Sequence, residues 1–239
     1  MKDEIYQFNN LLTYSSIKHG ISTKSFGSLK NEDGGINYDN IESFRTKLGI
    51  KDRAITMQQI HSGNVVTVHD SNNLRIAETD ALVTNQKGIP LLVLTADCLP
   101  IFLFDPKKEV IGLVHAGYRG LLQHIIEKTI QRFSSEFGSE TKDIVVGIGP
   151  AIEPECYEVG EEVIAKFQDA FPSFQAIFVQ KQEKYFLNLR EIAVQSLHKE
   201  GISKEHIEVA AICTKDDERF YSYRGGDKNG RFGSIICLC

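Results

Sequence analysis

The sequence predicts an α+β fold. It contains many short apolar or alternating runs typical of strands, but only three segments with helical periodicity. Several strand-like runs follow one another without an intervening helix, which argues against regular βαβ alternation and for separate layers of helix and sheet. With 239 residues, of which 41% are hydrophobic and 25% charged, the chain can bury a core without disulfides. We expect residues 1–239 to form one domain.

The predicted strands are short, and some are apolar along their whole length. They are expected near residues 54–60, 64–68, 80–84, 90–95, 100–104, 110–115, 143–148, 175–180, 185–189, 207–212 and 234–238. Two polar stretches, 29–40 and 214–233, are expected to be long loops, and loops of this length in a compact domain are often functional.

Three helices are expected, each from apolar residues that recur at three- and four-residue spacing. The first follows Gly120 and ends at Gly138, a typical glycine stop. The second covers residues 160–170. The third starts at Asn188, whose side chain can cap the helix while Glu191 occupies the capping-box position.

Charge and composition exclude several classes of function. The 27 basic and 32 acidic residues are mixed along the chain and give a net charge of −5, so no positive field favours nucleic acid or an anionic membrane. The N-terminal segment lacks the apolar stretch of a signal peptide, and no uninterrupted membrane-length run follows. We therefore expect a cytoplasmic protein, monomeric or homodimeric, with no nucleic-acid or membrane partner.

The five cysteines and the absence of nucleotide-binding loops narrow the chemistry further. An odd number of cysteines without a signal peptide favours reduced thiols over a disulfide framework. Neither a G-x-G-x-x-G segment nor a Walker loop follows any predicted strand, so dinucleotide and P-loop cofactors are not expected.

Three metal-capable side chains lie beside strong strand signals: His61, Cys98 and His115. Two imidazoles and one thiolate form the ligand set of an open zinc site, and their separation in sequence is too long for a zinc finger or ribbon. Each also has a structural interpretation: a turn histidine, a buried thiol and a hydrogen-bonded strand histidine. His115 is the strongest candidate because the following AGYRG segment allows close backbone approach and supplies the cation of Arg119.

Motifs around these residues resemble the YfiH family, also called multicopper polyphenol oxidase or laccase-domain proteins, over nearly the whole chain. The matching segments are QIHS, DALVT, TADCLPI, HAGYRG, IGPAIEPECYEVG and FYSYRGGDKNGRFG. The resemblance implies a four-layer α/β/β/α arrangement with mixed sheets. It also implies that His61, Cys98 and His115 are the ligands of one catalytic Zn²⁺.

The resemblance implies phosphorolysis of adenosine, inosine and methylthioadenosine, and deamination of adenosine, so purine nucleosides and phosphate are the expected small-molecule partners. Zinc held by one thiolate and two neutral imidazoles keeps a positive charge and a free position, which suits both reactions.

The residues expected to bind the substrate are mainly arginines. Guanidinium groups match phosphate bidentately, so Arg119, Arg224 and Arg231 are the candidates for phosphate or ribose binding. Cys156 matches a cysteine of the family and is expected to line the pocket, with a structural thiol as the alternative. The family's early HGxSTRxGG segment reads HGISTKSFGS here, so an anion-binding role is not carried over to Lys24.

The proton-transfer group is a choice between two carboxylates, Asp80 and Asp97. Asp97 adjoins Cys98 in sequence, but in a regular strand it would point to the opposite face of the sheet. Asp80, in the TDALVT segment, is an equal candidate.

Four alternatives share the same residues. A blue-copper site also uses two histidines and a cysteine, but it normally adds a weak axial ligand such as Met, and the chain has only Met1 and Met57. A laccase cluster needs paired histidine ligands, which the seven scattered histidines do not supply, so Cu²⁺ is disfavoured. A metal-free hydrolase would use Cys98 as nucleophile and His115 as base. The resemblance also carries a peptidoglycan-editing amidase role on UDP-muramyl precursors. A purely structural zinc would need a fourth protein ligand.

Overall fold

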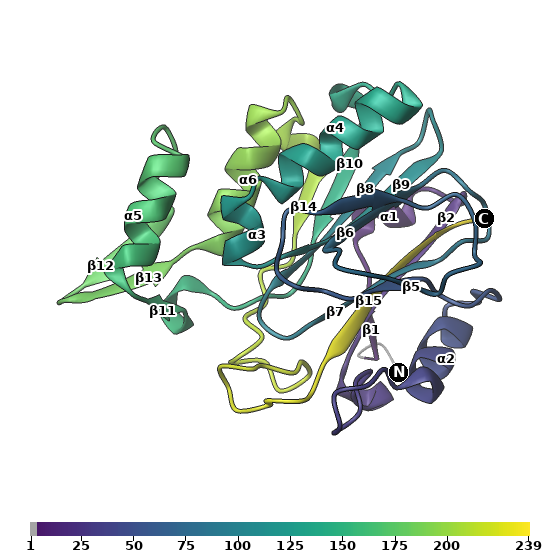
Figure 1. Ribbon diagram of the computed structural model, residues 1–239, viewed down its shortest axis with the longest axis horizontal. Coiled ribbons are helices and arrows are strands. Elements are labelled where there is room, and N and C mark those ends of the chain that lie inside the picture. The colour runs from purple at the N-terminus through teal and green to yellow at the C-terminus, as the bar shows by residue number, and fades with distance from the viewer. Residues whose placement is uncertain (1–3) are drawn as a thin grey trace.

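The computed structural model describes residues 4–239 and contains two large sheets with helices outside them (Figure 1). The larger sheet has six strands in the order β14, β10, β8, β9, β6, β4. These strands are β4 (Val65–Thr67), β6 (Ala81–Thr84), β8 (Leu99–Asp105), β9 (Val110–Ala116), β10 (Val145–Ile148) and β14 (Ile207–Val209). The sheet is mixed, since β4 pairs with β6 and β10 with β14 in parallel, while the central pairs are antiparallel.

The smaller sheet has four strands in the order β1, β2, β15, β7. They are β1 (Ile5–Tyr6), β2 (Ile17–Ser22), β7 (Leu91–Thr95) and β15 (Phe232–Leu238). All three pairings are antiparallel, so only the larger sheet has the expected mixed character. The last strand of the chain therefore lies in the middle of this sheet, next to a strand from its beginning.

The residues of β8 show how the layers are held together. All seven residues of this strand are buried because both of its faces are covered. Leu99, Ile101 and Leu103 belong to the apolar cluster shared with the helices, whereas Phe102 and Phe104 belong to the cluster between the two sheets. Burial on both faces explains why the strand reads as a continuous apolar run.

Helices cover the outer face of each sheet and complete the predicted four-layer α/β/β/α arrangement. Against the larger sheet pack α3 (Tyr118–Leu122), α4 (Ile125–Phe137) and α6 (Leu189–Lys199), while α5 (Glu161–Ala170) extends the same apolar cluster beside α3 and β13. The smaller sheet is covered by α2 (Tyr38–Lys47), through Ile41 and Phe44. The short α1 (Asn9–Leu12) adds Leu11 to the cluster between the sheets. The predicted fold class is confirmed.

Two smaller sheets and four 3₁₀ turns lie outside this frame. A three-stranded sheet, in the order β11, β13, β12, extends with α5 to one side of the molecule (Figure 1). Its strands are β11 (Glu158–Val159), β12 (Phe178–Lys181) and β13 (Lys184–Leu187), and a two-stranded sheet joins β3 (Thr56–Met57) to β5 (Arg75–Ile76). The 3₁₀ turns are η1 (Lys24–Phe26), η2 (Thr141–Asp143), η3 (Pro154–Cys156) and η4 (Lys204–His206).

Several predicted elements differ from the structure in extent. The strand expected at 54–60 is only Thr56–Met57, and the loop expected at 29–40 ends earlier because Asn37 caps α2. The helix expected after Gly120 is two helices, because His124 adopts a left-handed conformation with φ 59° between α3 and α4. The loop expected at 214–233 is confirmed up to the start of β15.

All five cysteines are free, in agreement with the expectation of reduced thiols. Within residues 4–239, no helix combines the length and apolar character needed to cross a membrane.

Candidate metal centre

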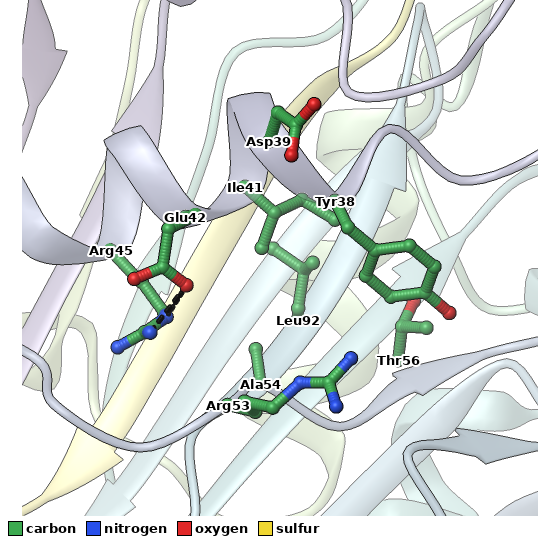
Figure 2. A pocket seen from close by; sticks show the side chains of 9 residues that line it. All are labelled: Tyr38, Asp39, Ile41, Glu42, Arg45, Arg53, Ala54, Thr56 and Leu92. Carbon is green, nitrogen blue, oxygen red and sulfur yellow. Dashed lines mark hydrogen bonds and ion pairs between the residues drawn. The ribbon is translucent and has the colours of Figure 1, made fainter.

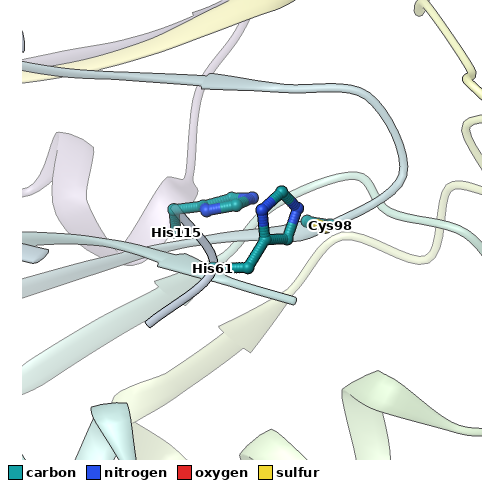
Figure 3. Close-up of side chains that lie close together, drawn as sticks. All are labelled: His61, Cys98 and His115. Atoms are coloured by element: carbon teal, nitrogen blue, oxygen red, sulfur yellow. The ribbon is translucent and has the colours of Figure 1, made fainter. Parts of the chain in front are cut away.

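The structure brings His61, Cys98 and His115 together from three separate segments (Figure 3). His61 lies in the turn after β3, Cys98 in the turn between β7 and β8, and His115 near the end of β9. One ligand atom from each lies within 4.8 Å of the other two, and the imidazole rings are 4.8 Å apart at an interplanar angle of 78°. His115 is buried, Cys98 half-buried and His61 exposed, so the group opens to solvent on the His61 side.

Asp80 fixes both histidines of this triad. Its carboxylate is fully buried and lies 2.8 Å from Nδ1 of His115, while it accepts hydrogen bonds from the backbone N–H groups of Ile60, His61 and Ser62. Burial alone would raise the pKa of Asp80, but the hydrogen bonds from His115 and Ser62 outweigh burial and lower the pKa to about 2. Because Asp80 is ionised, Nδ1 of His115 donates to it and Nε2 is directed to the centre.

Cys98 and His115 adjust each other's protonation. Burial alone would raise the pKa of Cys98, but His115 and His61 lower it to about 6. Burial alone would lower the pKa of His115, but the charges of Cys98 and Asp80 raise it to about 9. At neutral pH the sulfur is therefore a thiolate, the form required both of a metal ligand and of a nucleophile. A bound cation would replace the proton on His115.

A glycine makes room for the triad. A Cβ added to Gly117 would lie 2.9 Å from Sγ of Cys98 and 3.2 Å from Cδ2 of His61. Both contacts are too close for any other residue to fit without moving a ligand. This confirms the expectation that the AGYRG glycines allow close backbone approach, and it locates that approach at Gly117.

Asp97 anchors the late loop instead of pointing into a regular strand. Its φ of 88° interrupts the chain between β7 and β8, so the assumption of a regular strand does not hold. One carboxylate oxygen accepts hydrogen bonds from the hydroxyls of Thr214 and Ser222, and the other accepts the backbone N–H of Arg224. Asp97 thus ties the turn of Cys98 to two segments more than a hundred residues away.

Two of the predicted arginines, Arg224 and Arg231, lie in the late loop that Asp97 anchors. The guanidinium of Arg224 is 4.9 Å from the ring centroid of Tyr157 and donates to the carbonyl of Glu158. Burial lowers the pKa of Arg231, and the negative charges of Cys98 and Asp97 act against this change. The guanidinium of Arg231 donates to the backbone carbonyls of Lys228 and Gly230, and the backbone N–H of Arg224 donates to Asp97, next to Cys98.

The third predicted arginine, Arg119, is exposed on α3. Its Nε donates to the hydroxyl of Tyr118 at 3.0 Å, and its guanidinium lies 5.4 Å from the centroid of that ring. Gln123 on the same turn donates to the carbonyls of Arg119 and His61. Arg119 is thus connected through Gln123 to the backbone of His61, and its guanidinium contacts Tyr118.

Cys156, which is predicted to line the pocket, and Lys24, to which no anion-binding role is assigned, have partners outside the triad. Cys156 lies with Cys213 and Asp216 in a second group of potential ligands. Burial, followed by hydrogen bonds with Asp216 and Cys213, raises the pKa of Cys156 to about 12. Lys24 forms an ion pair with Asp227 at 3.1 Å, so its charge is used to hold the late loop.

Sequence reasoning missed Tyr157, Thr214, Ser222 and Gln123. Burial raises the pKa of Tyr157, and the charge of Cys98 adds to this effect, so the phenol stays neutral beside the triad. Its position next to Cys156 in the ECYEVG motif is a usable signal. The other three act only through tertiary hydrogen bonds, for which the local sequence carries no signal.

A separate small hollow of about 150 Å³ lies beneath α2, away from the predicted site (Figure 2). In it, Arg45 is paired with Glu42, and Arg53 lies 5.8 Å from the ring centroid of Tyr38. None of the predicted site residues lines it.

The proteins of known sequence that this chain resembles all point to one family. The family described as multi-copper polyphenol oxidoreductase laccase matches residues 18–239. A protein of Bacteroides thetaiotaomicron named purine nucleoside phosphorylase is 31% identical over 97% of this chain and 95% of its own length. The Escherichia coli protein named purine nucleoside phosphorylase YfiH is 31% identical over 92% of this chain and 90% of its own length.

Solved structures with a similar fold point to the same family. The crystal structure of YfiH from Bacillus licheniformis superimposes with a TM-score of 0.88 at 26% identity, over 99% of this chain and 97% of that one. YlmD from Geobacillus stearothermophilus also gives a TM-score of 0.88, at 25% identity and 99% coverage of both chains. With the motifs, the four-layer fold and these matches in agreement, the chain belongs to the laccase-domain family that includes YfiH.

Proposed function

We propose that this chain is a zinc-dependent purine nucleoside phosphorylase, acting on adenosine, inosine and methylthioadenosine, that also deaminates adenosine. The observation that carries the proposal is the convergence of one thiolate and two imidazoles on a single point that opens to solvent. The relatives named purine nucleoside phosphorylase support the choice of substrate class.

The donor set fits a zinc ion. His61, Cys98 and His115 offer the borderline-soft ligands that zinc prefers, and Asp80 orients His115 in the way that carboxylates orient zinc-bound imidazoles. Three protein ligands leave one position for a substrate atom or water. When bound, the zinc supplies a Lewis acid at that position.

Copper fits this site less well, because a blue-copper centre usually has an axial methionine. Met57 is only 2% exposed and belongs to the apolar cluster between the sheets. We therefore propose zinc as the metal.

In this proposal, arginine side chains bind the phosphate. In phosphorolysis an oxygen of phosphate bonds to C1′ of the ribose while the bond from C1′ to N9 of the purine breaks. The electron pair leaves with the base, which takes up a proton. Arg224 and Arg231, in the loop that Asp97 ties to the turn of Cys98, would hold the phosphate dianion by bidentate contacts, and the exposed Arg119 would assist its entry.

Both candidate proton-transfer carboxylates are assigned positioning roles. All oxygens of Asp80 and Asp97 accept hydrogen bonds from the protein, and Asp80 is held ionised well below neutral pH. Asp80 orients His115, and Asp97 holds the Arg224 loop against the turn of Cys98. Both set the geometry that a nucleoside and phosphate require.

The test combines metal analysis with a nucleoside panel. Purified wild type should contain zinc at the triad and convert inosine to hypoxanthine only when phosphate is present, and adenosine to inosine without it. His61→Ala, Cys98→Ser and His115→Ala should each lose that zinc and both activities. His69→Ala, which removes an exposed histidine elsewhere, is the matched control and should retain them.

Two outcomes would contradict the proposal. Full zinc occupancy of the triad in Cys98→Ser would show that the ligand assignment is wrong. Zinc-replete wild type that converts no nucleoside but releases the amino acid from a UDP-muramyl conjugate would show the editing amidase instead.

A further inference from the structure

We propose that Cys156, Cys213 and Asp216 form a second metal site, which binds zinc independently of the triad. Two thiols and a carboxylate are brought together there from two turns that are far apart in sequence. Their ligand atoms all lie within 4.8 Å of one another. The assignment does not depend on the proposed enzymatic function.

The distances suit tetrahedral zinc. With Zn–S bonds of about 2.3 Å and Zn–O bonds of about 2.0 Å, a sulfur and an oxygen on one tetrahedron lie about 3.5 Å apart. Sγ of Cys156 lies 3.4 Å and 3.6 Å from the two carboxylate oxygens of Asp216. Either oxygen can therefore share a zinc ion with this sulfur with little movement of the side chains.

The backbone holds the two turns in place before any ion binds. Cys213 pairs with Ala151 in a parallel bridge, and the N–H of Thr214 donates to the carbonyl of Ala151 at 3.0 Å. Within the second turn, the N–H of Asp216 donates to the carbonyl of Cys213, which brings both ligands to one side. A preformed arrangement lowers the ordering cost of binding.

The two thiols and the carboxylate of this second site favour a borderline-soft cation. Thiolates favour zinc and copper(I) over magnesium or calcium, and the carboxylate of Asp216 adds a harder ligand that suits zinc. Cys156 and Cys213 are half-buried and Asp216 is exposed, so an ion can enter from solvent and water can complete its coordination.

This second site would stabilise the surroundings of the triad. Thr214 follows Cys213 and donates its hydroxyl to Asp97, and the N–H of Ile152 donates to the carbonyl of Asp97. A metal that joins Cys156 to Cys213 therefore crosslinks the two turns that hold Asp97. We expect zinc at this site to raise the melting temperature even when the triad binds none.

The experiment uses full-length protein carrying His61→Ala and Cys98→Ser, which removes two ligands of the triad. After treatment with a chelator and desalting, this protein should bind one equivalent of zinc and show a rise in melting temperature on addition of zinc. Adding Cys213→Ser or Cys156→Ser should abolish both effects, and Asp216→Asn should weaken binding. Adding Cys239→Ser, which removes an exposed cysteine elsewhere, should change neither effect.

Cadmium provides an independent measurement, because its thiolate absorbance scales with the number of sulfur ligands. The background protein should show the band of two thiolates, and Cys213→Ser should lose it while its far-ultraviolet circular dichroism stays unchanged. The proposal is overturned if the background protein binds no zinc, if Cys213→Ser binds as much, or if peptide mapping recovers a disulfide between Cys156 and Cys213 in place of bound zinc.

Discussion

Asp80 connects both histidines of the triad through one buried carboxylate. Asparagine at this position would keep an oxygen for His115, but it would remove the negative charge and turn an NH₂ group toward the N–H groups of Ile60 and Ser62. We therefore expect Asp80→Asn to weaken zinc binding about 10-fold to 100-fold in competition with a chelator. Asp105→Asn, at the far end of β8, replaces another buried carboxylate and should leave zinc affinity unchanged.

Gly117 tests whether the space beside the ligands matters for metal binding. Gly117→Ala places a methyl group against Sγ of Cys98 and Cδ2 of His61, so the ligands must separate and zinc affinity should fall. Gly112→Ala is a comparison within the same strand region, because its methyl group meets the ring of Phe133 instead. That variant should lose about 1–3 kcal/mol of unfolding free energy and keep its zinc. Equal zinc affinity in Gly117→Ala and wild type would disprove the packing argument.

At the scale of the element, the cap of α6 is a prediction that the structure confirms in part. The side chain of Asn188 accepts the N–H of Glu191 at 3.0 Å, as the sequence predicts. The return arm of the capping box is absent, since Glu191 instead accepts a hydrogen bond from Gln195 and the N–H of Asn188 donates to Ile177. Local sequence identifies a cap well, but it does not show that Ile177, in the turn before β12, supplies the second partner.

Removing this cap should destabilise the protein modestly. Asn188→Ala leaves the N–H of Glu191 without its acceptor, and we expect the unfolding free energy in urea to fall by about 1 kcal/mol. Asn188→Asp keeps an acceptor oxygen and is the matched control. A loss as large in Asn188→Asp as in Asn188→Ala would indicate that the asparagine acts through another contact.

The elements missed by the sequence analysis share a physical cause. No strand was predicted for β2, because its residues IKHGIS combine a charge, a histidine and a glycine, yet His19, Gly20 and Ser22 are all buried. No helix was predicted at α2, because Ile41 and Phe44 are its main apolar residues in a polar segment. In both cases tertiary burial, and not local periodicity, determines the structure.

The candidate site likewise combines residues that local motifs indicate with contacts that only the tertiary structure determines. The three residues of the triad could be singled out because their motifs carry the family resemblance, and the structure brings all three together. Their role as metal ligands stays a prediction. The contacts that hold the turn of Cys98 in place could not be predicted from the local sequence. Asp97 adopts a positive φ that a non-glycine residue seldom has, and its partners Thr214 and Ser222 come from a distant loop.

At the scale of the whole molecule, stability depends on a histidine buried between the two sheets. His19 lies on β2, is 2% exposed, and stacks on Phe8 with its ring edge-on to Phe102. Its Nε2 accepts the backbone N–H of Phe8 at 2.9 Å, so the ring must be neutral at that nitrogen. Together with the hydrogen bond from the Gln7 side chain to the carbonyl of His19, it joins β2 to the segment leading into α1.

His19 should make the fold sensitive to mild acid. Burial lowers the pKa of His19 from 6.5 to about 4, so the unfolded chain takes up a proton before the folded one as the pH falls. The contribution to stability is complete above pH 6.5 and is lost progressively down to about pH 4, by about 3 kcal/mol in total. His19→Gln keeps an acceptor for Phe8 but does not titrate. In urea unfolding with excess chelator, wild type should therefore lose more stability than His19→Gln across this range. The variant His69→Gln, at an exposed histidine, is the control and should follow wild type. Parallel pH profiles for wild type and His19→Gln would show that His19 is not the acid-sensitive group.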